Sequence, residues 1–219
     1  FNYIKNIKKV INKINNLDIK INVKNNIDCP LYCLRAIQKV NNKKEVPEWL
    51  KERLTRGGID SINPVVDIVN YMMLEHGQPM HAFDLDKIIG DIQIREAKKG
   101  EKLLLLNNQE VTFFGGELVI TDDKNILALA GVMGGLESSV TSDTTNFLIE
   151  SAFFTPLSLA GVARSHSLNT ESSHRFERGV DFQQTINTLD ETTSHIIDLC
   201  GGESSNLIEE TSELPERKK

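Results

Sequence analysis

The chain has 219 residues, 39% of them hydrophobic, which is enough to bury a core without disulfide or metal cross-links. Its three cysteines are odd in number and have no partners at zinc-binding spacing, so neither a disulfide framework nor a structural metal is indicated. The formal net charge of −6 excludes a domain that holds nucleic acid by long-range attraction, so no DNA partner is expected and any RNA contact must be local.

The sequence indicates a protein of the cytoplasm without a membrane partner. No apolar run approaches the roughly 18 residues that span a bilayer, and the first residues do not have the pattern of a secretion signal. Free cysteines are typical of a reducing compartment. The chain starts at Phe1 rather than Met and ends in a charged Pro-Glu-Arg-Lys-Lys tail, which suggests a piece of a longer protein.

The composition divides the chain into three parts. Residues 1–27 are rich in Lys, Asn and Ile, and we interpret them as a linker and edge segment with a strand over 19–23. The lysines of this segment are more typical of a solvated face than of a binding arm. A single domain is expected over 28–203, followed by a C-terminal linker over 204–219.

The first half of the domain predicts one strand and two helices. The strand lies near 34–40, and a helix that begins at Pro47 ends at Gly57-Gly58. In the second helix Asn63 is a good N-cap, Pro64 suits the first turn and Gly77 ends it. This helix is apolar on nearly all sides, so it is expected to be buried.

The second half predicts a series of strands and then helices. Gly and Asn punctuation indicates a meander of short strands, then a longer strand over 146–154, a helix near Thr155-Pro156 and a last helix over about 182–199. This order favours an α+β fold, with helices packed on a largely antiparallel or mixed sheet. The strands of the expected meander are 92–97, 103–106, 111–114, 118–121 and 126–130.

Polar residues in apolar surroundings are the first candidates for a site. Asp67 and Asn70 share one face of the second helix, and burying such groups without partners costs about 1–3 kcal/mol each. Their partner is either neighbouring backbone, such as the Gln78-Pro79 turn, or, for Asn70, a ligand. His81 follows Pro79 on an expected constrained loop where reactive side chains are often presented, although a lone histidine is more often structural.

Glu150 is a sharper candidate, because it is the only carboxylate in the buried run 147–154. Without a partner it costs several kcal/mol or keeps its proton well above the ordinary pKa of about 4.3. Two explanations remain open: an ion pair with Arg164, Arg175 or Arg178, or a polar ligand.

The glycine-rich and loop segments narrow the chemistry. Gly131 to Gly135 lacks the Gly-Lys-Ser/Thr ending of a phosphate loop, so nucleotide binding is not indicated, but closely set glycines let a backbone approach a ligand. The segments 164–166 and 174–179 carry mixed charges on expected loops, suited either to ribose and phosphate contacts or to local salt bridges. No serine-hydrolase elbow or zinc-protease helix is present, so water would be the nucleophile of any hydrolysis.

Five separate motifs, taken in order, resemble the editing domain of the bacterial phenylalanyl-tRNA synthetase beta subunit. The resemblance runs from about Cys29 to Gly202. The motifs are residues 58–71, residues 78–84 (Gln-Pro-Met-His-Ala-Phe-Asp), residues 131–135, residues 150–154 (Glu-Ser-Ala-Phe-Phe) and residues 170–181 with Ser-His-Arg-Phe-Glu-Arg-Gly-Val-Asp at their end.

The resemblance implies hydrolysis of tyrosine that has been mischarged onto phenylalanine tRNA. It implies the acceptor end of that tRNA and the synthetase alpha subunit, in an α2β2 heterotetramer, as partners. No cofactor or metal is implied in this domain, whereas ATP and Mg²⁺ are implied for the parent enzyme. Motif by motif, the implied catalytic residues are His81 and Asn70, and the implied substrate-binding residues are Glu150, Gly134, Gly135, Thr170, Ser172 and Val69.

Three positions depart from the family pattern. Val69 stands where relatives commonly have Thr, Ser172 where they commonly have Ala, and Asp60 where some have Arg. Loss of the Thr hydroxyl would weaken the positioning of a water, and Ser172 would narrow the pocket or add a hydrogen bond. Two alternatives therefore stay open: a non-catalytic, tRNA-facing domain of a synthetase that has lost proofreading, and a freestanding deacylase.

Overall fold

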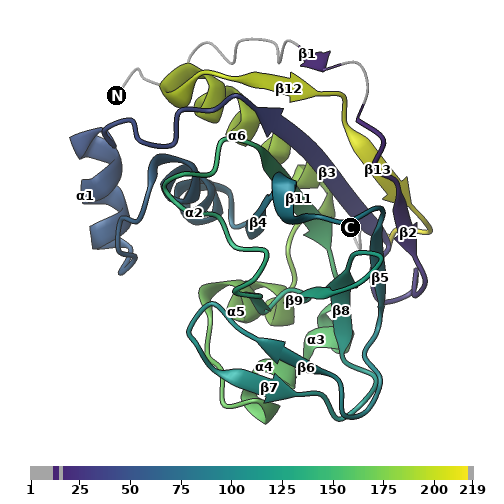
Figure 1. The fold of residues 1–219 in the computed structure, drawn as a ribbon. Helices are drawn as coiled ribbons and strands as arrows, with labels where there is room; N and C mark the ends of the chain where they lie inside the picture. The colour runs from purple at the N-terminus through teal and green to yellow at the C-terminus, as the bar shows by residue number, and fades with distance from the viewer. Residues whose placement is uncertain (1–11, 15–16, 217–219) are drawn as a thin grey trace.

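Two β-sheets lie face to face in the computed structural model, which describes residues 12–14 and 17–216 (Figure 1). The larger sheet has the strand order β1-β12-β3-β11-β4, with β13 also paired to β3, and the second sheet has the order β10-β9-β8-β5-β2. Apart from the parallel pairs β1–β12 and β2–β5, the strands pair antiparallel, which confirms the expected α+β fold with a mixed sheet. The strands are β1 Asn12–Ile14, β2 Ile21–Val23, β3 Leu31–Gln38, β4 Met80–Asp84, β5 Ile92–Glu96, β6 Lys102–Leu104, β7 Glu110–Thr112, β8 Leu118–Thr121, β9 Ile126–Leu129, β10 Met133–Gly134, β11 Phe147–Phe153, β12 Glu203–Ser205 and β13 Ile208–Thr211.

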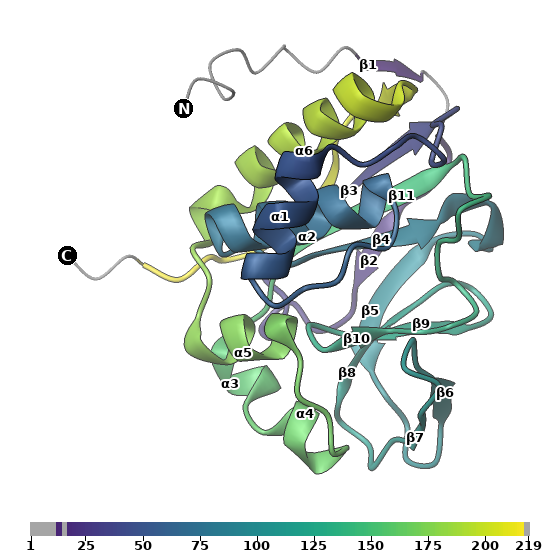
Figure 2. The same ribbon diagram turned by 90° about the vertical axis from the view of Figure 1, so that its left-hand side faces the viewer.

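The helices form two groups on opposite sides of the larger sheet. Three of them lie on its outer side, two against the sheet and one against a neighbouring helix, as Figure 2 shows, and three short ones lie near the second sheet. No helix in the described part of the chain is long and apolar enough to cross a membrane. The helices are α1 Glu48–Arg56, α2 Pro64–His76 and α6 Thr185–Cys200 in the first group, and α3 Pro156–Leu159, α4 Val162–Ser165 and α5 Glu171–Arg178 in the second, with 3₁₀ turns at Leu85–Lys87 and Phe182–Gln184.

Successive side chains of β11 point alternately into two hydrophobic cores, one on each face of the larger sheet. Leu148 and Ala152 pack in the core between the sheets, whereas Phe147 and Ile149 pack against the helices. Because successive side chains of a strand point to opposite faces, Glu150 belongs to the inter-sheet side. A third cluster fills the space between the second sheet, the β6–β7 hairpin and α4. A carboxylate thus stands in the wall of a hydrophobic core.

Two expectations about loops are wrong. His81 lies within strand β4, not on a loop, because β4 pairs with β11 immediately after the Pro79 turn. The segments 164–166 and 174–179 fall largely within α4 and α5. Helix α5 begins at a capping box, in which the side chains of Thr170 and Ser173 each accept a hydrogen bond from the other residue's backbone N–H. This helix start is not among the predicted elements.

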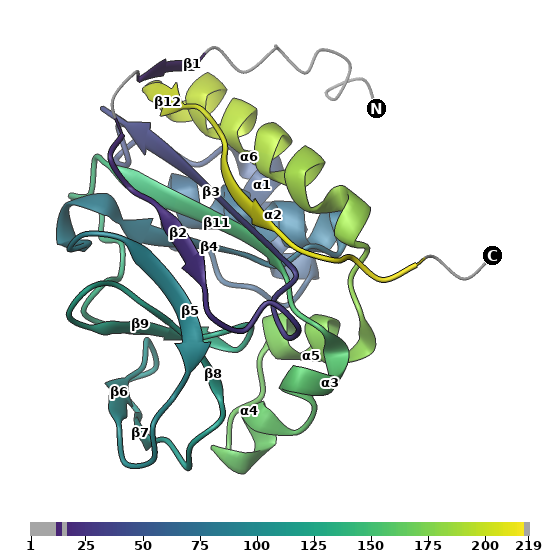
Figure 3. The ribbon, with the colours of Figure 1, turned by 90° about the vertical axis from the view of Figure 1, so that its right-hand side faces the viewer.

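The C-terminal segment is corrected as well. Residues 204–211 were expected to be linker, but β13 pairs with β3 from Leu34–Ile208 to Leu31–Thr211 and runs along it in Figure 3. In the N-terminal segment β2 forms an edge strand as expected, within the expected range 19–23, and part of the basic tract lies outside the described residues. The division into domain and linkers otherwise stays a prediction.

The cap of α2 gives the first prediction. The Asn63 side chain accepts a hydrogen bond from Val66 N at 3.0 Å, and it satisfies an amide that is otherwise unpaired. We expect Asn63→Ala to lower the free energy of unfolding by about 1 kcal/mol in urea titrations. Asn169→Ala, at an exposed loop position, is the matched control; equal midpoints for the two variants would contradict the capping role.

Candidate functional site

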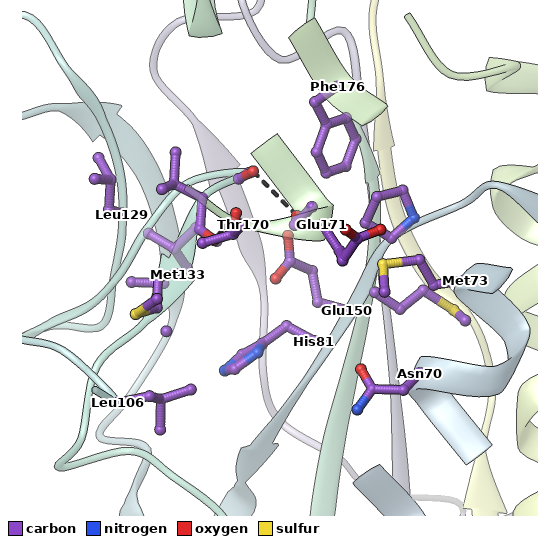
Figure 4. Close-up of a pocket in the computed structure, with 18 residues that line it drawn as sticks. Asn70, Met73, His81, Leu106, Leu129, Met133, Glu150, Thr170, Glu171 and Phe176 are labelled. Carbon is purple, nitrogen blue, oxygen red and sulfur yellow. Dashed lines mark hydrogen bonds between the residues drawn. The ribbon is translucent and has the colours of Figure 1, made fainter. Parts of the chain in front are cut away.

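A cavity of about 240 Å³ opens where β4, β11, the β9–β10 turn, α2 and the start of α5 meet (Figure 4). Six of the eight residues implied by the resemblance line it: Asn70, His81, Gly134, Glu150, Thr170 and Ser172. Segments that are far apart in the sequence are thus brought together as one site.

Val69 and Gly135 do not line this cavity. Val69 is buried within α2, so its side chain is not presented to a ligand. The Gly135 amide donates to Leu127 O at 2.7 Å, and a methyl group there would lie 2.8 Å from that same oxygen. Gly135 therefore serves close backbone packing, and its implied role in substrate binding stays a prediction.

Glu150 and His81 are direct neighbours in the sheet. They face each other across the β11–β4 ladder, so both side chains stand on the same face. Figure 4 shows them pointing to different parts of the cavity: the Glu150 carboxyl toward Thr170 and Glu171, and the His81 ring toward Leu106. The two polar groups therefore lie toward different parts of the cavity.

The Glu150 carboxyl has no counter-charge. It is 6% exposed, and no hydrogen bond or ion pair from the described residues reaches it. Of the two explanations left open, the ion pair is wrong, because none of Arg164, Arg175 and Arg178 pairs with Glu150 in the described residues. Arg175 pairs with Glu171 at 2.5 Å, and Arg178 donates to His174 O. Burial raises the pKa of Glu150 from 4.5 to about 8, so the carboxyl keeps its proton at neutral pH.

His81 is neutral for the converse reason. Burial lowers the pKa of its imidazole from 6.5 to about 4, because the charged form is poorly solvated there. Its Nε2 is buried, and no residue of the described chain hydrogen-bonds to it. The ring packs edge-on against Phe83 with 4.6 Å between centroids, which fixes its plane. A methyl group at Gly134 would lie 2.5 Å from Nε2, so this glycine makes room for the imidazole.

The two polar residues of α2 have separate roles. The Asp67 carboxylate accepts from Ile62 N at 2.7 Å and from the Ser61 hydroxyl, so it fastens the turn before the helix and does not reach the Gln78-Pro79 turn. Asn70 is half-buried at the cavity edge, and its side-chain amide makes no hydrogen bond within the described residues. Of the pair, only Asn70 is available to a ligand.

The hydroxyls of Thr170 and Ser172 hold α5 in place. Thr170 Oγ1 donates to Val132 O at 3.0 Å, and Ser172 Oγ donates to Gly131 O at 3.0 Å. Both bonds join the first turn of α5 to the turn between β9 and β10. The hydrogen bond that Ser172 adds is thus made within the protein.

The apolar walls were missed at the sequence level. Leu106, Met133 and Phe176 enclose the space around the two titratable groups, as Figure 4 shows. Leu106 lies in a turn, Met133 in the short strand β10 and Phe176 in α5, and no local pattern marks them as lining a site. Only the exposure of Leu106, 41% despite its apolar side chain, distinguishes it, and that value requires the fold.

The chain matches curated proteins over most of its length. It is 48% identical over 190 residues to the phenylalanine–tRNA ligase beta subunit of Photorhabdus laumondii, covering 86% of this chain and 24% of that protein. It is 46% identical over 203 residues to the corresponding subunit of Vibrio parahaemolyticus, covering 92% and 25%. The chain therefore spans about a quarter of the length of these relatives.

A solved structure shares the fold. It is an N-terminal fragment of the phenylalanyl-tRNA synthetase beta subunit from Pyrococcus horikoshii, with a TM-score of 0.60, 15% identity, and coverage of 96% of this chain and 60% of that one. The sequence profile of the B3/4 domain matches residues 28–201, most of the chain. With that match and the similarity to synthetase beta subunits, the chain belongs to the B3/4 domain family.

Proposed function

We propose that this domain hydrolyses tyrosine that has been mischarged onto phenylalanine tRNA, as the editing part of a phenylalanine–tRNA ligase beta subunit. One observation carries the proposal: a buried carboxyl group without a protein partner, Glu150, in the wall of a largely apolar cavity. A polar group in such a place requires a ligand that supplies the missing hydrogen bond.

The selectivity follows from hydrogen bonding. A pocket shaped for phenylalanine discriminates poorly against a molecule that adds one hydroxyl, whereas a second site that pairs this hydroxyl selects it. Protonated Glu150 offers both an acceptor oxygen and an O–H donor to a phenol. Phenylalanine would leave the buried carboxyl unpaired, at about 1–3 kcal/mol, and would be spared.

The ester end would lie at His81 and Asn70. In the reaction a water adds to the ester carbonyl, the bond to the ribose oxygen breaks, and tyrosine and free tRNA leave. A pKa of about 4 makes His81 a weak general base at neutral pH, so its expected part is to hold the water and the carbonyl by hydrogen bonds. Asn70 would supply an amide donor or acceptor from the opposite side of the cavity.

The setting of the reaction is part of the proposal, and the similarity to synthetase beta subunits supports it. In the proposed parent enzyme the beta subunit pairs with an alpha subunit in a cytoplasmic α2β2 heterotetramer, and the tRNA acceptor end enters this cavity. ATP and Mg²⁺ would serve the synthetic reaction outside this domain. The step proposed here needs only water and the ester.

This function is tested by measuring, with the parent synthetase, the release of tyrosine from phenylalanine tRNA that has been charged with tyrosine. We expect Glu150→Ala to slow release of tyrosine by about 5- to 150-fold, because the hydroxyl loses its partner, and to raise the slow release of phenylalanine, because no buried carboxyl is left unpaired. Glu137→Ala removes an exposed carboxyl group and is the matched control. Wild-type release at the uncatalysed rate would instead favour a tRNA-facing domain without proofreading.

Gly134→Ala tests the placement of His81 without removing it. The added methyl group collides with the imidazole, and a shift of about 1 Å at a reacting group can cost about 100-fold in rate. We expect single-turnover deacylation to fall as far as it falls in His81→Ala. Gly57→Ala crowds the end of Leu74 in α2 and is the control; if it slows the reaction equally, the effect is general packing and not His81.

The pH dependence of stability tests the neutral state of Glu150. Because its folded pKa of about 8 lies above 4.5, its contribution is fully present below pH 4.5 and is lost as the pH rises through 8. His81 acts oppositely, and its contribution is lost as the pH falls from 6.5 to 4. Relative to Glu150→Gln, the wild-type unfolding free energy should fall between pH 5 and 8, by up to about 1.4 kcal/mol per pH unit. A flat difference in urea titrations would show that Glu150 is ionised at neutral pH.

A further inference from the structure

A second polar group is buried in the core that contains Glu150. Tyr32 lies in β3, has no exposed surface, and its hydroxyl has no hydrogen-bond partner in the described part of the chain. It is not among the residues that line the cavity. A tyrosine hydroxyl in a core normally has a partner, and leaving one unpaired costs stability.

The register of the sheet places this hydroxyl on the Glu150 side. Leu34 lies directly opposite Glu150 on β3, and Tyr32 lies two residues away, opposite Ala152. Residues two apart share a face, and diagonal neighbours across an antiparallel pair are within reach of aromatic and long side chains. The small Ala152 leaves the space opposite Tyr32 unfilled by a large side chain. Two groups that lack partners thus occupy adjoining positions of one core.

We propose that Tyr32 is a positioning residue for Glu150, whose carboxyl receives the Tyr32 O–H as a hydrogen bond when it binds a hydroxylated ligand or loses its proton. This bond would occupy one carboxyl oxygen and leave the other directed into the cavity. It would thus set which oxygen meets the ligand. The proposal deepens the proposed function but concerns a contact that would form on ionisation of Glu150 whether or not the domain hydrolyses an ester.

Electrostatics agree with this pairing. Burial, followed by the nearby Glu150 carboxylate, raises the pKa of Tyr32 well above 10, so its phenol stays a neutral donor wherever Glu150 titrates. Cys29, the other polar neighbour of Glu150 in this core, directs its thiol to Leu31 O at 3.8 Å. Tyr32 therefore remains the donor without another partner.

The test is a carboxyl titration by NMR of the 219-residue chain with ¹³C-labelled glutamate. Glu150 is identified by the resonance that Glu150→Gln removes. Because a hydrogen bond to the ionised form favours ionisation, we expect Tyr32→Phe to raise the midpoint of this titration by about one pH unit. Tyr71→Phe removes a hydroxyl that bonds Arg53 and Glu75 on the helix side of the sheet, and it should leave the midpoint unmoved. An unmoved midpoint in Tyr32→Phe overturns the proposal.

Two further readouts separate the possible failures. If Tyr32→Phe does not fold, the ring Cζ resonance of wild-type Tyr32 decides: it should shift at the Glu150 midpoint, and absence of that shift overturns the pairing. In the parent synthetase, Tyr32→Phe should lower kcat/KM for tyrosyl-tRNA about tenfold and leave the phenylalanyl ester unchanged. A moved midpoint in an enzyme that releases no tyrosine would reject the proposed function and keep the pairing.

Discussion

The burial of a carboxyl group without a counter-charge is the constraint on which the arrangement of this site depends. Glu150 projects into the core between two sheets, where an ionised carboxylate is poorly solvated. Burial raises the pKa of Glu150, so the carboxyl keeps its proton. The same burial lowers the pKa of His81 on the neighbouring strand, so the imidazole stays unprotonated. Glu150 and His81 are thus both neutral, so the cavity favours a neutral ligand with hydroxyl or carbonyl groups.

The packing around these two groups keeps them apart. The imidazole is held by Phe83 on one side and enters the space left by Gly134 on the other. The start of α5 is fixed by hydroxyl bonds from Thr170 and Ser172 to the β9–β10 turn. Since these contacts come from different parts of the chain, the cavity exists only when both sheets and α5 are in place. The site is a property of the assembled fold and of no single motif.

Sequence reasoning found the polar members of the site more readily than its geometry. Glu150 was identified because a carboxylate in an apolar strand violates the burial pattern, and α2 was placed because Asn63, Pro64 and Gly77 mark its ends. His81 was assigned to a loop because a Pro-containing turn hides the strand that follows it. The ion pair between Glu150 and Arg175 or Arg178 does not form, because within helix α5 both side chains bond to local acceptors.

Other features of the structure depend on contacts between residues that are far apart in the sequence, so the local sequence does not predict them. In the strand β13, Glu209 and Glu210 interrupt the apolar pattern, so the sequence predicts a linker there, whereas the structure pairs the segment with β3. The roles of Gly134 and Gly135 differ only in what lies next to them, an imidazole in one case and a backbone carbonyl in the other. Neighbouring glycines in one motif cannot be told apart from sequence alone.

The pairing of β3 has a consequence for how the chain folds. This early strand is completed by β11, β12 and β13, and its residue Leu34 pairs with Glu150 and Ile208. Contacts so distant along the chain form late and slowly. During synthesis at about 5–20 residues per second, β3 would wait on the order of ten seconds for its partners. Through that interval the strand has open edges, so a nascent chain is most exposed to aggregation or chaperone capture before its last strands emerge.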